Sequence, residues 1–114
     1  MKILEINNTE DAKKEIAAID CTVEGVNMMA EKAVFRVVKL ADVNTKAANI
    51  LKQTMLSKGG EAALSRHCVD LSHATSDVIL MATLKQYRMV IPVLLMQPWG
   101  LKKIAADLKT LLGL

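Results

Sequence analysis

The residues best suited to chemistry lie where an expected strand runs into an expected helix. Thr45 and Lys46 stand at one such junction, Thr83 and Lys85 stand at another, and residues 7–9 form a third. A helix N-terminus presents backbone amides to an anion, and a hydroxyl or ammonium group beside it adds further donors. In open α/β sheets, ligands also settle beyond the carboxyl ends of the strands. Thr45, Lys46, Thr83 and Lys85 are therefore candidates for binding a small anionic ligand.

A second set of residues consists of cysteines and histidines, which often form metal or catalytic sites, but their spacing in this chain does not suit either kind of site. Cys21, His67, Cys68 and His73 could be assembled into a metal site or a Cys/His nucleophile pair. His67 and Cys68 are adjacent, however, and adjacent residues of a strand point to opposite faces. The chain also lacks the C-x-x-C and H-x-x-x-H spacings typical of metal ligands. We therefore expect no metal, no cofactor and no catalytic residue, with Cys68 as a buried thiol and His67 exposed.

Charge divides the chain into two unequal segments. Residues 1–31 carry three basic and seven acidic residues, a net charge of −4, whereas residues 32–114 carry 12 basic and five acidic residues, a net charge of +7. The two segments either attract each other, stay separately solvated, or mark a site for a charged partner. The chain has only three aromatic residues to stack on bases, so we expect no nucleic-acid partner.

Length and composition limit the class of protein. The chain has 114 residues, 52% of them hydrophobic and 24% charged, which fits one small folded domain. A (β/α)₈ barrel needs about 250 residues, so barrel enzymes are excluded. No apolar run approaches the roughly 18 residues of a membrane span, and the first residues lack the pattern of a secretory signal. We therefore expect a cytoplasmic protein without membrane attachment and with reduced cysteines.

Periodicity predicts one strand, one helix and an irregular connection in the acidic segment. Residues Lys2–Ile6 alternate polar and apolar side chains, which is typical of a strand. Asn8 or Thr9 then caps a helix whose apolar residues share one face. Residues Asp20–Lys32 combine scattered charge with a glycine, so we expect an irregular stretch there.

The middle of the chain predicts a strand, a helix and a second strand. Residues Ala33–Leu40 are rich in valine, as strands often are. A helix capped by Asn44 or at the next residue should run over 45–58, where Gly59-Gly60 ends it. A strand over Glu61–Cys68, or one residue longer, follows at once. This order predicts a right-handed βαβ unit whose two strands are parallel.

The C-terminal third predicts a buried strand and two helices. Residues Val78–Ala82 form a continuous apolar run, as in a strand buried on both faces. Thr83 and Gln86 fit a capping box that starts a helix at once. Pro92 should kink or truncate that helix because it lacks a backbone donor. Apolar residues at helical spacing then predict a terminal helix from residue 101.

Together these elements predict an α/β (α+β) fold in which helices pack against a small mixed β-sheet. The expected element order is β-α-β-α-β-β-α-α. We expect a single domain over residues 1–114, made of an acidic β-α segment (1–31) and a core βαββαα unit (32–114).

Several strings of residues resemble the N-terminal extension that precedes the barrel in certain bacterial dihydropteroate synthases. The resemblance is tightest over residues 45–101, and its strings are Ala47-Ala48-Asn49-Ile50-Leu51-Lys52-Gln53, Met55-Leu56-Ser57, Gly59-Gly60-Glu61-Ala62-Ala63, Asp77-Val78-Ile79-Leu80-Met81, Thr83-Leu84-Lys85-Gln86-Tyr87 and Gln97-Pro98-Trp99-Gly100-Leu101. The family joins a pterin pyrophosphate to p-aminobenzoate in folate biosynthesis, and its catalytic motifs lie in the barrel. The resemblance thus implies a pathway but supplies no active-site residue.

The residues and the resemblance together favour a non-catalytic accessory or interaction domain related to dihydropteroate synthase. Its expected partner is either a second copy, giving a homodimer, or a barrel protein of the dihydropteroate-synthase type. The alternative is a module that binds a pterin or another anion at the strand-to-helix junctions.

Overall fold

Helices dominate the chain and surround a small three-stranded sheet. A computed structural model describes all residues, 1–114. The elements in chain order are α1 (Thr9–Ala17), α2 (Val23–Ala30), β1 (Phe35–Asn44), α3 (Thr45–Ser57), β2 (Glu61–Leu64), the 3₁₀ helix η1 (Arg66–Cys68), β3 (Thr75–Thr83), α4 (Leu84–Leu94) and α5 (Leu101–Leu112). The predicted fold class, helices packed on a small sheet, is confirmed. None of the five α-helices combines the length and the apolar character needed to cross a bilayer.

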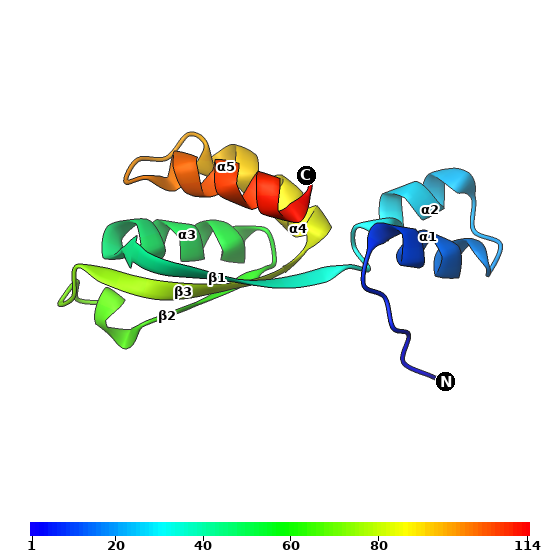
Figure 1. Cartoon of the computed structure of the whole chain (residues 1–114), viewed down its shortest axis with the longest axis horizontal. Helices are drawn as coiled ribbons and strands as arrows, with labels where there is room; N and C mark the ends of the chain where they lie inside the picture. The colour runs from blue at the N-terminus through cyan, green and yellow to red at the C-terminus, as the bar shows by residue number, and fades with distance from the viewer.

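The sheet has the strand order β1-β3-β2, and both pairings are antiparallel (Figure 1). The predicted mixed sheet is therefore wrong, whereas the parallel direction predicted for the two strands that flank α3 is confirmed. The two strands run in the same direction, but β3 lies between them and pairs with both. A strand-helix-strand order gives the direction of the strands, whereas a third strand that inserts between them is a long-range event that local sequence does not show.

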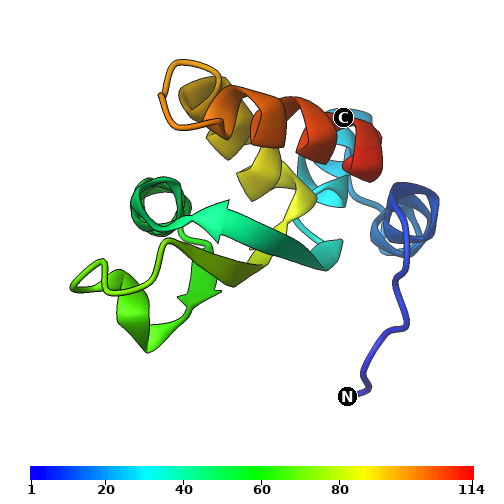
Figure 2. The same cartoon turned by 60° about the vertical axis from the view of Figure 1, so that its left-hand side comes forward.

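The three C-terminal helices α3, α4 and α5 lie on the same side of the sheet (Figures 1 and 2). The main core forms there and includes Leu51, Met55, Leu80, Tyr87 and Leu101, none of which is exposed. The apolar run of β3 was predicted to be buried on both faces. That prediction is wrong, since burial alternates along the strand and Ile79 remains 36% exposed.

The N-terminal third forms a helical hairpin that projects from one end of the sheet (Figure 1). The predicted strand Lys2–Ile6 is absent, because no neighbouring strand is available to pair with it. The predicted irregular stretch Asp20–Lys32 instead contains α2, which begins where the Thr22 hydroxyl accepts the Gly25 amide at 3.0 Å. This cap is the local signal that the sequence reading missed.

The hairpin contacts the rest of the chain through a small apolar cluster of its own. Ala12 of α1 and Ala30 of α2 pack with Val34 and with Leu84 at the start of α4. The projecting hairpin gives the molecule an elongated shape of 53 × 30 × 21 Å.

Most of the predicted helix ends are confirmed. Asn8 and Asn44 cap α1 and α3, and Gly59 follows α3 with a φ of +84°, the left-handed conformation that glycine adopts freely. Helix α4 ends at Leu94, two residues beyond Pro92. The predicted strand after Gly60 is shorter than expected, because the chain turns into η1 at Arg66.

Candidate functional site: junctions, charge clamp and open sheet face

Thr45 and Lys46 occupy the first turn of α3, where the backbone donors already have partners. Thr45 is buried and its amide donates to the carbonyl of Ala74 at 3.1 Å. The Asn44 side chain accepts the amide of Lys46 at 2.9 Å and that of Ala47 at 3.4 Å. The Lys46 ammonium lies 4.7 Å from the centre of the Trp99 ring, a cation–π contact.

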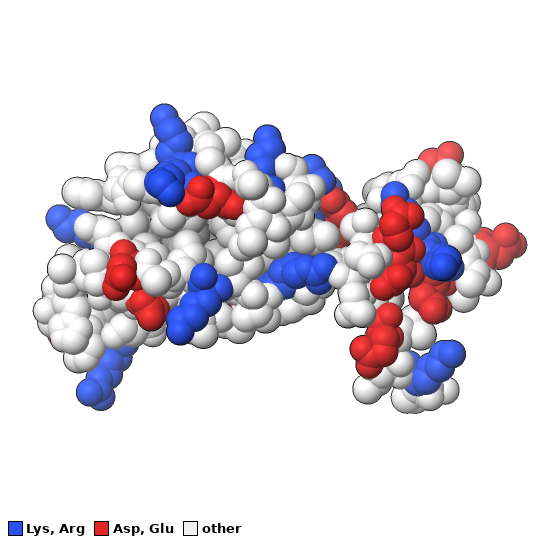
Figure 3. Space-filling view, viewed as in Figure 1, with Lys and Arg blue, Asp and Glu red and all other residues white.

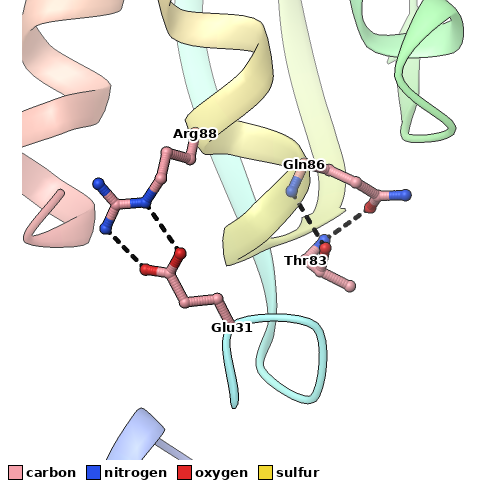
Figure 4. A network of polar contacts seen from close by, with 4 residues as sticks. All are labelled: Glu31, Thr83, Gln86 and Arg88. Atoms are coloured by element: carbon pink, nitrogen blue, oxygen red, sulfur yellow. Dashed lines mark hydrogen bonds and ion pairs between the residues drawn. The ribbon is translucent and has the colours of Figure 1, made fainter. Parts of the chain in front are cut away.

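Thr83 and Lys85 occupy the first turn of α4, where the capping box is confirmed (Figure 4). The Thr83 hydroxyl accepts the amide of Gln86 at 3.2 Å, and the Gln86 side chain accepts the amide of Thr83 at 2.8 Å. The amide of Leu84 donates to Val34 at 2.9 Å, and that of Lys85 donates to the carbonyl of Glu31 at 3.2 Å. The first-turn amides of α4 are therefore bonded within the chain.

The structure does not bring the two candidate junctions together. Because β1 and β3 are antiparallel, Asn44 lies opposite Thr75 and Thr83 lies opposite Phe35. The junction after β1 and the junction after β3 are therefore at opposite ends of the sheet. At about 3.3 Å per residue along β1, they lie roughly 30 Å apart. A single small ligand would not span that distance.

One ion pair joins the acidic hairpin to the basic body of the molecule. The Glu31 carboxylate at the end of α2 accepts two hydrogen bonds from the Arg88 guanidinium on α4, at 2.8 and 2.7 Å (Figure 4). The hydrogen bonds from Arg88, with its positive charge and those of Lys85 and Lys13, hold the pKa of Glu31 below its ordinary value. Glu31 in turn raises the pKa of Arg88. The Arg36 guanidinium also donates to the carbonyl of Asn7.

The other acidic side chains of the hairpin are exposed, except that of Asp11, which is half-buried and accepts the amide of Asn7 at 3.3 Å. Figure 3 shows them gathered on the projecting hairpin, while lysine and arginine side chains spread over the body of the molecule. The charge asymmetry of the sequence thus becomes a spatial separation, with a single ion pair, Glu31–Arg88, recorded between the hairpin and the body.

The histidines and cysteines do not assemble a reactive site. His67 and Cys68 lie in η1 rather than in a strand, so the predicted reason for their separation is wrong. Cys68 is buried, as expected, whereas His67 is half-buried rather than exposed. The His67 ring stacks on the His73 ring with 3.8 Å between ring centres. No group of three His, Cys, Asp or Glu side chains is placed to hold a metal ion.

Sequence reasoning missed the face of the sheet that no helix covers (Figure 2). Its side chains form two rows across the strands: Val37, Met81 and Glu61 in one, and Lys39, Ile79 and Ala63 in the other. Phe35 begins the face with 56% of its surface exposed, and Val37 is 64% exposed. The signal was present in the sequence, since β1 carries apolar residues at both even and odd positions, which is typical of a strand between two layers.

A hollow opens on this face beside β2. It has a volume of about 490 Å³, and Lys39, Ala63, Asp77 and Ile79 are among the residues that line it. The open face therefore combines exposed apolar side chains with a depression and a rim of mixed charge. Exposed apolar patches of this kind are typical of interaction surfaces.

Comparisons with known proteins connect the chain to folate biosynthesis. It is 36% identical over 110 residues, 96% of its length, to a probable bifunctional folylpolyglutamate synthase/dihydropteroate synthase of Halobacterium salinarum. It is also 36% identical over 82 residues, 72% of its length, to a bifunctional dihydropteroate synthase/dihydropteroate reductase of Helicobacter pylori. No family model and no solved structure matches the chain.

The chain corresponds to a small part of each relative. It spans 13% of the Halobacterium salinarum protein and 22% of the Helicobacter pylori protein. The resemblance found in the sequence is therefore supported at the level of folate-pathway proteins. This chain is related to a short region of bifunctional folate enzymes.

Proposed function

We propose that this chain is a non-catalytic accessory domain of the folate pathway, corresponding to the extension ahead of a dihydropteroate-synthase barrel. Its role is to associate with such a barrel protein or with a second copy of itself. The observation that carries the proposal is the uncovered face of the sheet, where Phe35 and Val37 are more than half exposed. The relatives support the choice of pathway, because both carry dihydropteroate synthase in their names.

A barrel protein is a suitable partner for the open face. The outer surface of a (β/α)₈ barrel is a ring of amphipathic helices, and sheets in two-faced α/β architectures carry helices on both sides. Docking a helix of the barrel against Val37, Ile79 and Met81 would give the sheet the second helical layer that it lacks. In both relatives the matching segment belongs to a much longer chain, so such a partner would be held close by.

The alternative, a pterin or anion site at the junctions of Thr45, Lys46, Thr83 and Lys85, receives less support. The first-turn amides of α3 and α4 already donate to Ala74, Asn44, Val34, Glu31 and Thr83. An anion would have to displace these internal partners before it gained any hydrogen bond from the backbone.

The decisive experiment measures binding of the full chain to a dihydropteroate-synthase barrel protein from the same source, by calorimetry and by co-elution. Ala63→Arg places a long charged side chain on the open face, beside Ile79 and in the hollow, and we expect it to abolish binding. Ala106→Arg is the matched control, since Ala106 is exposed on α5 and lies away from that face. Equal binding by both variants would contradict the proposed surface.

A turnover assay tests the non-catalytic part of the proposal. The purified chain is incubated with pterin pyrophosphate and p-aminobenzoate, and we expect no dihydropteroate above the rate without protein. Product formed by the chain alone would overturn this part, whatever the outcome of the binding experiment.

A further inference from the structure

We infer that a second copy of this chain docks in a groove between the outer edge of β1 and helix α5. The inference rests on the proposed function in taking self-association as one role of the domain. It uses a different surface from the open sheet face, although Lys39 lies at the border of both. The groove has a volume of about 650 Å³. Its apolar lining includes Val38, Leu40, Val43, Ile104, Leu108 and Leu111.

The strand wall of the groove is an edge of the sheet with no strand beyond it, where the carbonyls of Phe35 and Arg36 already accept side-chain hydrogen bonds from Arg36 and Tyr87. The strand order β1-β3-β2 leaves β1 with a neighbour on one side only. Residues Phe35–Leu40 run in regular register with β3, so their outer edge is straight over six residues. Long regular edge strands pair readily with strands of other chains unless they are interrupted or covered. The other edge strand, β2, has only four residues and offers a much shorter template.

A bulge sets the limit of the pairing edge. The register between β1 and β3 shifts between Leu40 and Val43, and Asp42 takes a positive φ of 51°. The amide of Asp42 donates to the carboxylate of Asp77 at 3.0 Å, so it is not free to pair with another strand. Strand pairing between copies would therefore use Phe35–Leu40, and the part of the groove beyond Leu40 would receive side chains.

Charge complementarity identifies the occupant as a second copy. The strand wall carries Lys39 and Asp42, and the helix wall carries Lys103 and Asp107, whose charged atoms lie 2.9 Å apart. Each wall thus has one basic and one acidic residue. A two-fold axis through the groove places the two strand walls side by side in opposite directions, and likewise the two helix walls. The basic residue of each wall then faces the acidic residue of the same wall in the other copy. A two-fold interface must be self-complementary in this way.

A partner of different chemistry fits the groove less well. A groove that binds a strongly acidic or basic peptide carries an excess of the opposite charge. This groove has two basic and two acidic residues, so it favours neither kind of peptide. A second copy also provides an apolar side chain that can occupy the groove, because Leu111 lies at the rim with 68% of its surface exposed. In the two-fold dimer, Leu111 of each copy enters the groove of the other.

Sedimentation velocity over a wide range of protein concentration tests the inference. We expect the wild-type chain to form a dimer and Leu111→Asp to remain monomeric. Val69→Asp is the matched control, because Val69 is 90% exposed beside η1 and lies outside the groove. Circular dichroism of each variant verifies folding. A wild-type chain that stays monomeric at millimolar concentration, or a Leu111→Asp chain that dimerises as the wild type does, would overturn the inference.

Charge reversal tests the arrangement of the two copies. Asp107→Lys leaves two basic residues on the helix wall, and we expect dimerisation about tenfold weaker. Adding Lys103→Asp to the same chain restores the opposite signs and should recover most of the affinity. Wild-type affinity in Asp107→Lys, or no recovery in the double variant, would contradict the two-fold pairing of these walls.

The outcomes separate this inference from the proposed function. Ala63→Arg should abolish binding to the barrel protein and leave the dimer intact. Leu111→Asp should abolish the dimer and leave binding to the barrel protein intact. If the wild-type chain dimerises but does not bind a barrel protein, the barrel protein is excluded as a partner and the groove interface is supported. A monomeric chain that binds the barrel protein would remove the groove interface alone.

Discussion

The Glu31 carboxylate and the Arg88 guanidinium form a two-bond ion pair across 57 positions of sequence, with Nε and Nη2 at 2.8 and 2.7 Å from the two carboxylate oxygens. The pair joins the end of α2 to α4. It is reinforced by the backbone, because the amide of Lys85 donates to the carbonyl of Glu31. This short region anchors the helical hairpin to the body of the molecule, together with the small cluster around Ala30 and Leu84.

Replacing Glu31 by Gln should loosen the hairpin more than it destabilises the whole domain. The Arg88 side chain is 49% exposed, so water screens the pair, and we expect a loss of only about 0.5–1 kcal/mol in the free energy of unfolding. Hydrogen exchange should show faster exchange in α1 and α2 than in α3. Glu15→Gln is the control, since Glu15 is an exposed acid of the same hairpin; an equal effect there would contradict the anchoring role.

The same pair makes stability depend on pH in the acidic range. Arg88 lowers the folded pKa of Glu31 below its ordinary value of 4.5. The stabilisation by the Glu31–Arg88 pair is therefore complete above about pH 4.5. It is lost as the pH falls through the lower pKa that Glu31 has in the folded state. Urea unfolding between pH 3 and pH 7 should show a smaller decline for Glu31→Gln than for the wild type.

Tyr87 connects the core to the sheet through its hydroxyl. Its ring is fully buried, and the hydroxyl donates to the carbonyl of Arg36 in β1 at 2.8 Å. Tyr87→Phe leaves that carbonyl without this donor, and we expect a loss of about 1–2 kcal/mol. Burial raises the pKa of Tyr87 from 10.0 to about 12. The wild type should then lose stability as pH rises from 10 to 12, because the unfolded chain releases the proton first.

Absorbance of tyrosinate checks this prediction directly, since Tyr87 is the single tyrosine of the chain. Its ionisation should coincide with unfolding or occur well above pH 10. Titration of a folded chain near pH 10 would contradict the burial of the hydroxyl. The Phe variant should lack the corresponding decline in stability.

We expect Thr83 to stabilise the fold as a helix cap, whether or not a ligand is present. Its hydroxyl caps α4 by accepting the amide of Gln86, and loss of such a cap costs about 1 kcal/mol. We expect Thr83→Ala to lower the thermal midpoint and Thr83→Ser to restore it, as measured by circular dichroism. Wild-type stability in Thr83→Ala would show that the hydroxyl serves another purpose.

Pterins, folates and inorganic phosphate should leave the thermal midpoint unchanged. The first-turn amides at the two candidate junctions have partners within the chain, so a bound anion would gain few new hydrogen bonds. A ligand at 100 times its dissociation constant would stabilise the fold by about 2.7 kcal/mol. A dose-dependent rise of that size would favour the ligand-binding alternative.

Local signals predicted much of the secondary structure. The caps at Asn8, Asn44 and Thr83 are encoded within three or four residues, and so is the end of α3 at Gly59. One error arose where a local pattern needed a distant partner, and another where one local signal outweighed a second. The alternation of Lys2–Ile6 suits a strand, but a strand forms only beside another strand. In Asp20–Lys32 the cap at Thr22 outweighs the glycine at position 25.

The sequence by itself determined most of the helices and strands after residue 32, the caps at Asn8, Asn44 and Thr83, and how charge is divided between residues 1–31 and 32–114. These properties depend on neighbours a few positions apart. Only the tertiary structure decided that β3 enters between β1 and β2, that the two candidate junctions lie at opposite ends of the sheet, and that one sheet face stays uncovered. Those features arise from contacts between distant segments, whose pairing depends on the packing of the whole chain.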